Sequence, residues 1–193
     1  MRSIVVFASG SGTNAEKVIE YLNEMVEKEV SAVFSNKKDA GVLERARKLN
    51  VPTIIFNRTD LYDTGRVLDL LEKEDPYLIV LAGFLWLVPT EIIQKYEGRI
   101  VNIHPALLPG YGGKGMYGMH VHKAVIDNKE QESGISIHYV NEKYDEGDII
   151  FQAKCKVEQN DTPESLAKKI HVLEHRYFPE VISKLLDKIQ EKG

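Results

Sequence analysis

The chain has 193 residues, of which 43% are hydrophobic and 28% are charged, and its formal net charge is −4 at pH 7. These values are ordinary for a soluble globular protein with a substantial core. The acidic balance excludes a broad basic face, so nucleic acid is not an expected partner. The single cysteine, Cys155, excludes a disulfide framework and a cysteine-rich zinc site and favours the reducing cytoplasm. The apolar runs are too short for a signal segment or a membrane span, so no membrane partner is expected.

The first hundred residues alternate between strand and helix patterns. Strands are predicted, in order, over residues 4–8, 31–36, 51–56, 77–82 and 99–103, and the later helices over 40–49, 62–74 and 89–96. This alternation predicts βαβ units, a parallel sheet and right-handed crossovers.

The first helix is predicted to start beside Thr13. Thr13 with Glu16 three residues later is typical of a capping box. The helix is expected to carry an apolar stripe formed by Val18, Ile19, Leu22, Met25 and Val26.

The pattern changes after residue 110. A helix near 118–128 precedes two strands, 134–140 and 148–157, joined by about seven residues, which is too short for a helical crossover and predicts an antiparallel pair. A last helix opens at Thr162, with Pro163 at its first helical position. The fold class is therefore α/β: a single-domain, Rossmann-like fold with a mostly parallel twisted sheet and an antiparallel strand pair in its C-terminal half.

Residues 10–14, Gly-Ser-Gly-Thr-Asn, lie between the first strand and the first helix. Glycines allow close approach of the backbone, and a helix start offers free N–H groups, so the segment suits a phosphate. It lacks the third glycine of a dinucleotide fingerprint, where Ala15 stands, and the Gly-Lys-Ser/Thr of a P-loop. A flexible turn that binds no ligand stays open.

Asn102-Ile103-His104-Pro105 lies at the carboxyl end of a parallel strand, where open α/β sheets bind ligands. Strand alternation puts Asn102 and His104 on one side, where an amide can hold an oxyanion and an imidazole can move a proton. A carboxylate of the acidic turn 144–148 would raise the pKa of His104 and favour its protonated form. A capping Asn, a structural His and a solvated turn are the alternatives that the local sequence leaves open.

Two histidine patterns resemble metal ligands. His171, Glu174 and His175 form H-x-x-E-H, the inverted zinc-peptidase pattern, on a predicted helix. The match is weak and supplies no third protein ligand, so no metal is predicted. His120 and His122 are expected to be surface residues near a helix start.

Together these residues resemble the folate-dependent formyltransferases. The resemblance covers essentially the whole chain and is carried by VFASGSGTN at the start, LAGFLWLVP at 81–89, GRIVNIHPALLPGY at 98–111, GISIHYVNEKYDEGDIIFQ at 134–152 and LEHRYFPEVI at 173–182. Their order and spacing make the match specific. It implies one formyltransferase domain over 1–193, with a nucleotide-binding half over 1–100 and a catalytic and folate half over 101–193.

The resemblance implies transfer of a formyl group from 10-formyltetrahydrofolate to the amine of 5'-phosphoribosylglycinamide through a tetrahedral intermediate, with no metal. The family's catalytic set falls on Asn102, protonated His104 and Asp145. The substrate residues fall on Gly12, Thr13 and Asn14 for the phosphate and on Glu174 near the amine. The folate cleft falls on Leu85, Trp86, Leu87, Val88, Asn102, Asn141, Tyr144 and Asp145, with Arg58 as its arginine and Thr59 as the competing position.

Other acceptors stay open. Related enzymes pass the formyl group to water or to methionyl-tRNA, but they usually carry an extra domain, which 193 residues do not accommodate. A non-catalytic nucleotide-binding module would keep the glycine loop without needing the three catalytic residues. Segment 110–118, GYGGKGMYG, is longer and richer in glycine than in many members. The expected partners are small molecules, and the protein is expected to be a monomer or a homodimer in the cytoplasm.

Overall fold

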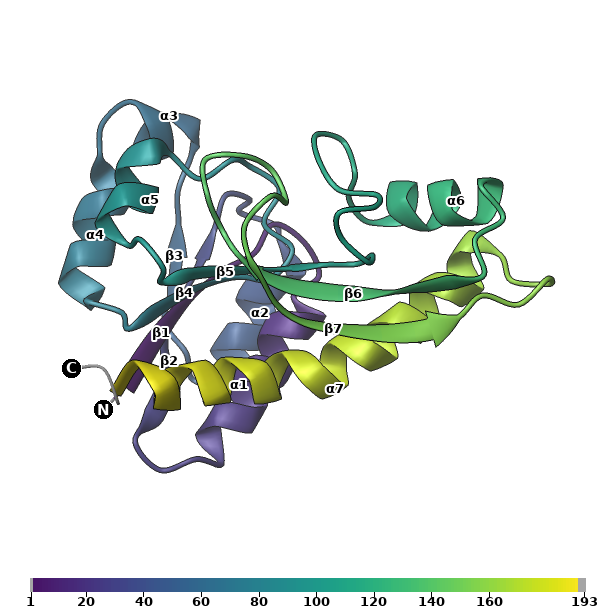
Figure 1. Cartoon of the computed structure of the whole chain (residues 1–193). Helices are drawn as coiled ribbons and strands as arrows, with labels where there is room; N and C mark the ends of the chain where they lie inside the picture. The colour runs from purple at the N-terminus through teal and green to yellow at the C-terminus, as the bar shows by residue number, and fades with distance from the viewer. Residues whose placement is uncertain (1, 191–193) are drawn as a thin grey trace.

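One mixed sheet runs through the whole chain, of which this computed structural model describes residues 2–190. Its strands lie in the order β3-β2-β1-β4-β5-β6-β7 (Figure 1). The parallel strands are β1 (Arg2–Phe7), β2 (Lys28–Ser35), β3 (Thr53–Ile55), β4 (Leu78–Leu81) and β5 (Ile100–His104). β6 (Glu132–Tyr139) is antiparallel to β5, and β7 (Ile149–Lys156) is antiparallel to β6. The predicted α/β fold with an antiparallel pair at one end is confirmed.

Helices cover both faces of the sheet (Figure 1). α1 (Thr13–Asn23), α2 (Gly41–Lys48) and α7 (Pro163–Gln190) pack on one face. α3 (Arg58–Tyr62), α4 (Arg66–Glu74) and α5 (Thr90–Lys95) pack on the other, while α6 (Met119–Asp127) contacts α7. Among residues 2–190, no helix is both long enough and apolar enough to cross a bilayer.

The central strands are rich in apolar residues because both of their faces are buried. In β1, Ile4 and Val6 belong to the core under α1, α2 and α7, whereas Val5 and Phe7 belong to the core under α3, α4 and α5. This explains the uninterrupted apolar run at the start of the sequence, and the predicted strand is confirmed.

The first helix starts where the sequence predicts but is capped differently. The capping box is wrong: Gly12 is the N-cap residue, at φ 78°, and no side chain caps the helix. Glu16 pairs with Arg45 of α2 instead of reaching back to the helix start. The helix ends at Asn23, so Met25 and Val26 lie beyond it, with Val26 85% exposed, and they do not extend the buried stripe.

The helix predicted over 62–74 is two helices. Asn57 and Asp60 form a capping box that starts α3 earlier than predicted. Gly65, at φ 71°, then separates α3 from α4. The last helix begins as predicted, since Thr162 Oγ1 accepts a hydrogen bond from the Ser165 N–H at 3.2 Å.

Candidate active site

One cavity of about 680 Å³ opens at the carboxyl ends of β1, β4 and β5. The connections of β1 and β4 leave toward opposite sides of the sheet there, and open α/β sheets bind ligands at such a switch point. We call this cavity the cleft. It is lined by residues 10–14, 81–88, 102–105 and 113–118, by His122, His138, Val140, Asn141 and residues 143–145, and by His171 and Glu174. Every predicted site residue except Arg58 lines it.

Asn102, His104 and Asp145 come together in the cleft. Alternation along β5 places Asn102 and His104 on one face, and the cleft covers both. Asp145 reaches them from the β6–β7 connection: its Oδ2 lies 3.5 Å from His104 Nδ1, and its Oδ1 accepts from Asn102 Nδ2 at 3.4 Å. The backbone N–H of Gly113 donates to Oδ2 at 2.9 Å and anchors the carboxylate further.

His104 is 3% exposed, and burial lowers its pKa. Asp145 and the carbonyl of Tyr111, which lies 2.7 Å from Nε2, act in the opposite direction without reversing that shift. Asp145 raises the pKa of His104, as expected for a carboxylate partner, but desolvation of the imidazolium is larger and the net direction is down.

The carboxylate side of this pair is charged. Burial raises the pKa of Asp145, but the neighbouring His138, His104 and the Gly113 N–H outweigh it, and the net direction is down. Asp145 is itself held at φ 56°, in the left-handed region. The acidic turn therefore places one buried carboxylate against the imidazole, while Glu146 and Asp148 stay exposed.

One end of the cleft, which we call the glycine-loop end, is built by residues 10–14 and α7. Asn14 Nδ2 donates to Glu174 Oε2 at 3.1 Å, and Asn14 Oδ1 is buried without a partner in the described part of the chain. Glu174 is 6% exposed, and burial raises its pKa. Arg45 of α2 donates to the carbonyl of Ser11 at 3.0 Å and supports the loop from behind.

The residues of the H-x-x-E-H string are not arranged as metal ligands in the described part of the chain. His171 Nε2 lies 4.0 Å from Glu174 Oε2, and the His171 and His175 rings stack with centroids 6.1 Å apart. Within residues 2–188, no group of three or more His, Cys, Asp or Glu side chains is arranged to hold a metal ion. Glu174 accepts a hydrogen bond from Asn14 and belongs to the glycine-loop end.

The opposite wall is formed by residues 85–88 with Asn141 and Tyr144. Tyr62 donates to the carbonyl of Leu87 at 2.8 Å, and the N–H of Leu85 donates to Ser9 Oγ at 3.1 Å, so the segment is tied down at both ends. Arg58 lies outside the cleft lining, with its guanidinium carbon 4.9 Å from the Tyr62 ring centroid and 5.9 Å from that of Trp86.

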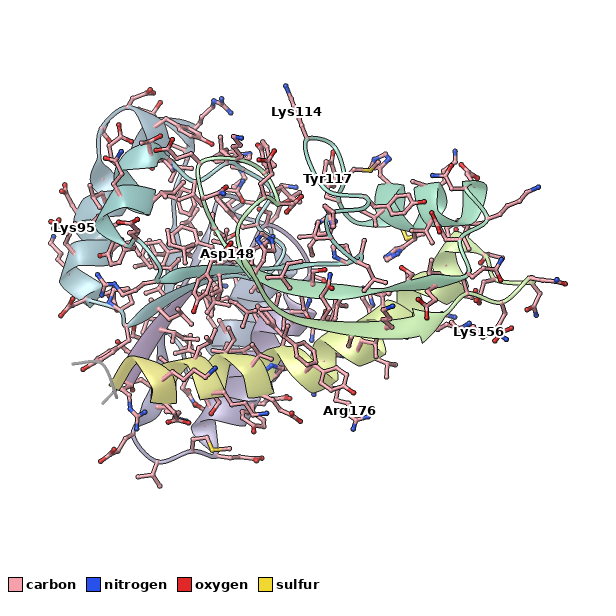
Figure 2. All side chains as sticks on the ribbon, in the orientation of Figure 1. Lys95, Lys114, Tyr117, Asp148, Lys156 and Arg176 are labelled. Carbon is pink, nitrogen blue, oxygen red and sulfur yellow. The ribbon has the colours of Figure 1, made fainter. Side chains whose placement is uncertain are left out.

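Segment 110–118 contributes residues 113–118 to the lining of the cleft. Gly113, Gly115 and Gly118 all have positive φ, which explains the glycine content. Its backbone supplies both the Tyr111 carbonyl, which contacts His104, and the Gly113 N–H, which contacts Asp145. Lys114 projects outward at the tip of the segment (Figure 2).

Two histidines of the cleft were not predicted from the sequence: His122 was expected at the surface, and His138 was not singled out. His122 is 3% exposed, so its predicted surface position is wrong, and burial lowers its pKa to about 4. It faces inward because α6 turns that side chain toward His104 and His171. His138, in GISIHYV, lies directly opposite Asn102 in the sheet. Pairing the predicted strands 99–103 and 134–140 in the correct register would have indicated that His138 lies beside Asn102.

Known proteins share this chain's sequence and fold. The sequence pattern described as formyl transferase matches residues 2–182. A chloroplastic phosphoribosylglycinamide formyltransferase of Arabidopsis thaliana is 41% identical, over 96% of this chain and 66% of its own length. The phosphoribosylglycinamide formyltransferases of Escherichia coli and Bacillus subtilis are 35% and 34% identical, over 96% of this chain and 87% and 95% of theirs. The chain thus spans just under two thirds of the plant relative and most of the bacterial ones.

Solved structures agree. Phosphoribosylglycinamide formyltransferase from Anaplasma phagocytophilum superposes with a TM-score of 0.89 at 30% identity, over 96% of this chain and 87% of that one. The enzyme from Bacillus halodurans superposes with a TM-score of 0.87 at 36% identity. This match covers 97% of this chain and 96% of that one. The sequence match covers both the glycine loop, residues 10–14, and the end of β5, residues 102–105. The chain therefore belongs to the formyl transferase family.

Proposed function

We propose that this protein transfers a formyl group from 10-formyltetrahydrofolate to the amine of 5'-phosphoribosylglycinamide in purine biosynthesis. One observation carries the proposal: a single cleft joins a helix-start loop suited to phosphate, an apolar and aromatic wall, and a buried Asn-His-Asp set between them. Two substrates entering from opposite ends would meet at that set.

The residues of the glycine-loop end fit a phosphorylated ribose. Gly12, Thr13 and Asn14 offer backbone N–H groups at the start of α1, where the helix dipole favours an anion. Asn14 Oδ1 has no partner in the described chain and is ready to accept a donor. Glu174 is placed to accept hydrogen bonds from the sugar or the amine.

The opposite wall fits a folate. Leu85, Trp86, Leu87 and Val88 offer an apolar edge with backbone polar groups, and Asn141 and Tyr144 face them. A ring system with donors and acceptors on its rim matches such a slot. Arg58, at the outer side of Trp86, contacts the folate where it leaves the cleft.

The reaction follows from this placement. The amine nitrogen attacks the formyl carbon, and the carbonyl oxygen becomes an oxyanion. Asn102 and protonated His104, which both line the cleft, stabilise that oxyanion. The oxyanion then collapses to the new formyl carbonyl as the carbon–nitrogen bond to the folate breaks. His104 gives its proton to the leaving folate nitrogen and takes up the proton that the attacking nitrogen loses. Asp145 keeps the imidazole oriented, while the lowered pKa of His104 makes its charged form a stronger acid.

In this proposal the substrates are small molecules, and nucleic acid is not a partner. The protein works in the cytoplasm as a monomer or a homodimer. A formyl-transfer assay with three acceptors tests the activity: 5'-phosphoribosylglycinamide, water and methionyl-tRNA. Transfer to the ribonucleotide at least 100-fold faster than to the other two is expected. Preference for water or tRNA would replace the proposal, and no transfer to any of them would favour a binding module.

A further inference from the structure

His122, on α6, has a buried imidazole that no hydrogen bond ties to the described part of the chain. The residue is 3% exposed and lines the cleft. Its Nδ1 is buried without a partner among the described residues, and no hydrogen bond contributes to the pKa of the ring. An unpaired buried polar group costs roughly 1–3 kcal/mol, so such a group in a cleft is a candidate to meet a ligand. The reaction described above gives His122 no part.

The two ring nitrogens of His122 have different surroundings. Nδ1 is enclosed by the protein, whereas Nε2 is not among the buried atoms without a partner and opens onto the cleft that the ring lines. A stranded N–H group is rarer in folded proteins than an unused lone pair, so the proton belongs on Nε2. His122 therefore offers the cleft one N–H donor, and the matching ligand atom is an oxygen that accepts.

His122 offers this donor without a charge. Burial and the neighbouring His171 and His104 lower its pKa to about 4, so the ring is neutral at pH 7. A neutral N–H does not balance the charge of a phosphate, for which residues 10–14 offer the start of α1. The partner of His122 is therefore expected among the uncharged oxygens of a ligand.

The place of His122 in the cleft indicates which ligand this is. The ring is close enough to His104, at the end of β5, and to His171, on α7, for both to act on its pKa. α6 itself packs against α7, the helix that carries Glu174 at the glycine-loop end. His122 thus lies near both the reacting groups and the glycine-loop end. In the proposed acceptor, the part between amine and phosphate carries the ribose hydroxyls and one amide carbonyl.

We propose that His122 is a specificity-determining residue, whose Nε2–H donates a hydrogen bond to an uncharged oxygen of the acceptor, either a ribose hydroxyl or the amide carbonyl. The identity of the acceptor rests on the proposed function, whereas the unpartnered ring does not. Because this contact is remote from the bond that forms, it stabilises the bound acceptor and the transition state alike. It therefore changes the affinity for the acceptor and leaves kcat in place.

His122→Leu tests the contact, because it removes the donor and keeps an apolar side chain in the buried site. KM and the calorimetric Kd for the acceptor are expected to rise about 3- to 10-fold, as for the loss of one hydrogen bond between neutral groups. The value of kcat, KM for the folate and the Kd of a folate analogue are expected to stay within about 2-fold, and the last of these shows that the variant is folded.

Two further variants sharpen this comparison. His122→Gln sets an amide N–H close to the place of Nε2 and is expected to recover most of the affinity for the acceptor. His120→Leu, at the exposed neighbour on α6 that does not line the cleft, is the matched control and is expected to keep the wild-type Kd. An unchanged Kd for the acceptor in His122→Leu, or a Gln variant that binds no better than Leu, contradicts the proposal.

Acceptor analogues identify the oxygen. Wild type and His122→Leu are compared for acceptors that lack the 2'-hydroxyl, the 3'-hydroxyl or the phosphate. With a hydroxyl partner, the loss on His122→Leu disappears for the acceptor without that hydroxyl, and with the carbonyl as partner it is the same for all three. A loss that disappears only without the phosphate overturns the proposal, because the partner is then charged. These affinities need no turnover, so they are read separately from the transfer assay that decides the proposed function.

Discussion

A Cβ atom built on Gly12 would lie 2.4 Å from the Cβ of Val42, so α2 packs directly against the loop that precedes α1. Gly12 also has φ 78°, in the region where a side chain adds strain. The packing of α2 against the loop thus requires a glycine at this position. From the sequence alone, the same glycine was explained by the close approach of a ligand.

Gly12→Ala is therefore expected to shift the loop away from α2, to weaken nucleotide binding about 10-fold or more, and to destabilise the fold by about 1–3 kcal/mol. Calorimetric binding of the ribonucleotide and of a folate analogue, with urea unfolding, measures all three effects. Gly10→Ala is the matched control for stability, since nothing lies within 4 Å of its Cβ and its φ is not positive. Equal loss of both ligands in a folded Gly12→Ala variant would contradict the assignment of the loop to the phosphate.

Asp145→Asn tests the pair with His104. Asp145 favours the imidazolium against burial, so removing its charge is expected to move the already lowered pKa of His104 further down. Turnover is expected to fall about 100-fold or more, the usual range for a proton-transfer group. NMR titration of His104 gives the pKa, and a formyl-transfer assay gives the rate.

Asp148→Asn is the control for that experiment, because Asp148 is an exposed acidic residue of the same connection (Figure 2). It is expected to leave both the titration and the rate unchanged. If the His104 midpoint stays in place in Asp145→Asn, Asp145 is not its partner and acts only as a loop residue.

The central strands were predictable because they are buried on both faces, and the run at 4–8 is continuously apolar. Helix ends were less predictable, since they depend on tertiary contacts: Glu16 pairs with Arg45 and not with its own helix start. Asn102, His104 and Asp145 were accessible from their motifs. His138 and the Tyr111 carbonyl were not, because their roles arise from strand register and from backbone geometry in a glycine-rich segment.

Arg58 remains the predicted folate arginine, although it lies outside the cleft lining on the rings of Tyr62 and Trp86. Arg58→Ala is expected to raise KM for 10-formyltetrahydrofolate about 10-fold, with KM for the ribonucleotide and kcat unchanged, since it removes binding remote from the reacting atoms. Arg66→Ala, which breaks an exposed ion pair with Asp60, serves as the control. An unchanged folate KM would assign Arg58 to packing on the aromatic rings alone.

Chelation is expected to leave turnover unchanged. Glu174, the carboxylate of the H-x-x-E-H string, accepts a hydrogen bond from Asn14 and lies at the glycine-loop end of the cleft. Dialysis against EDTA, followed by elemental analysis and the formyl-transfer assay, measures the effect. Zinc bound in a one-to-one ratio, with loss of turnover on its removal, would revive the peptidase interpretation.

His122 predicts how stability depends on pH. Its folded-state pKa is about 4, below the ordinary value of about 6.5, so the unfolded chain binds the extra proton first as the pH falls. The stability that depends on neutral His122 is therefore complete above about pH 6.5 and is lost progressively down to about pH 4. At about 1.4 kcal/mol per pKa unit, the loss over that window is roughly 3 kcal/mol.

His122→Leu is expected to remove this part of the pH dependence, because Leu cannot take up a proton in either state. Urea unfolding at pH 8, 6 and 4.5 compares the wild type with the variant. The curve of the variant should fall less steeply below pH 6.5, though not flatten, since burial also lowers the pKa of His104 and His175. His120→Leu, at the exposed neighbour on α6, should keep the wild-type slope. An unchanged slope in His122→Leu would mean that the imidazole is already accessible to protons in the folded protein, in conflict with its burial against His104 and His171.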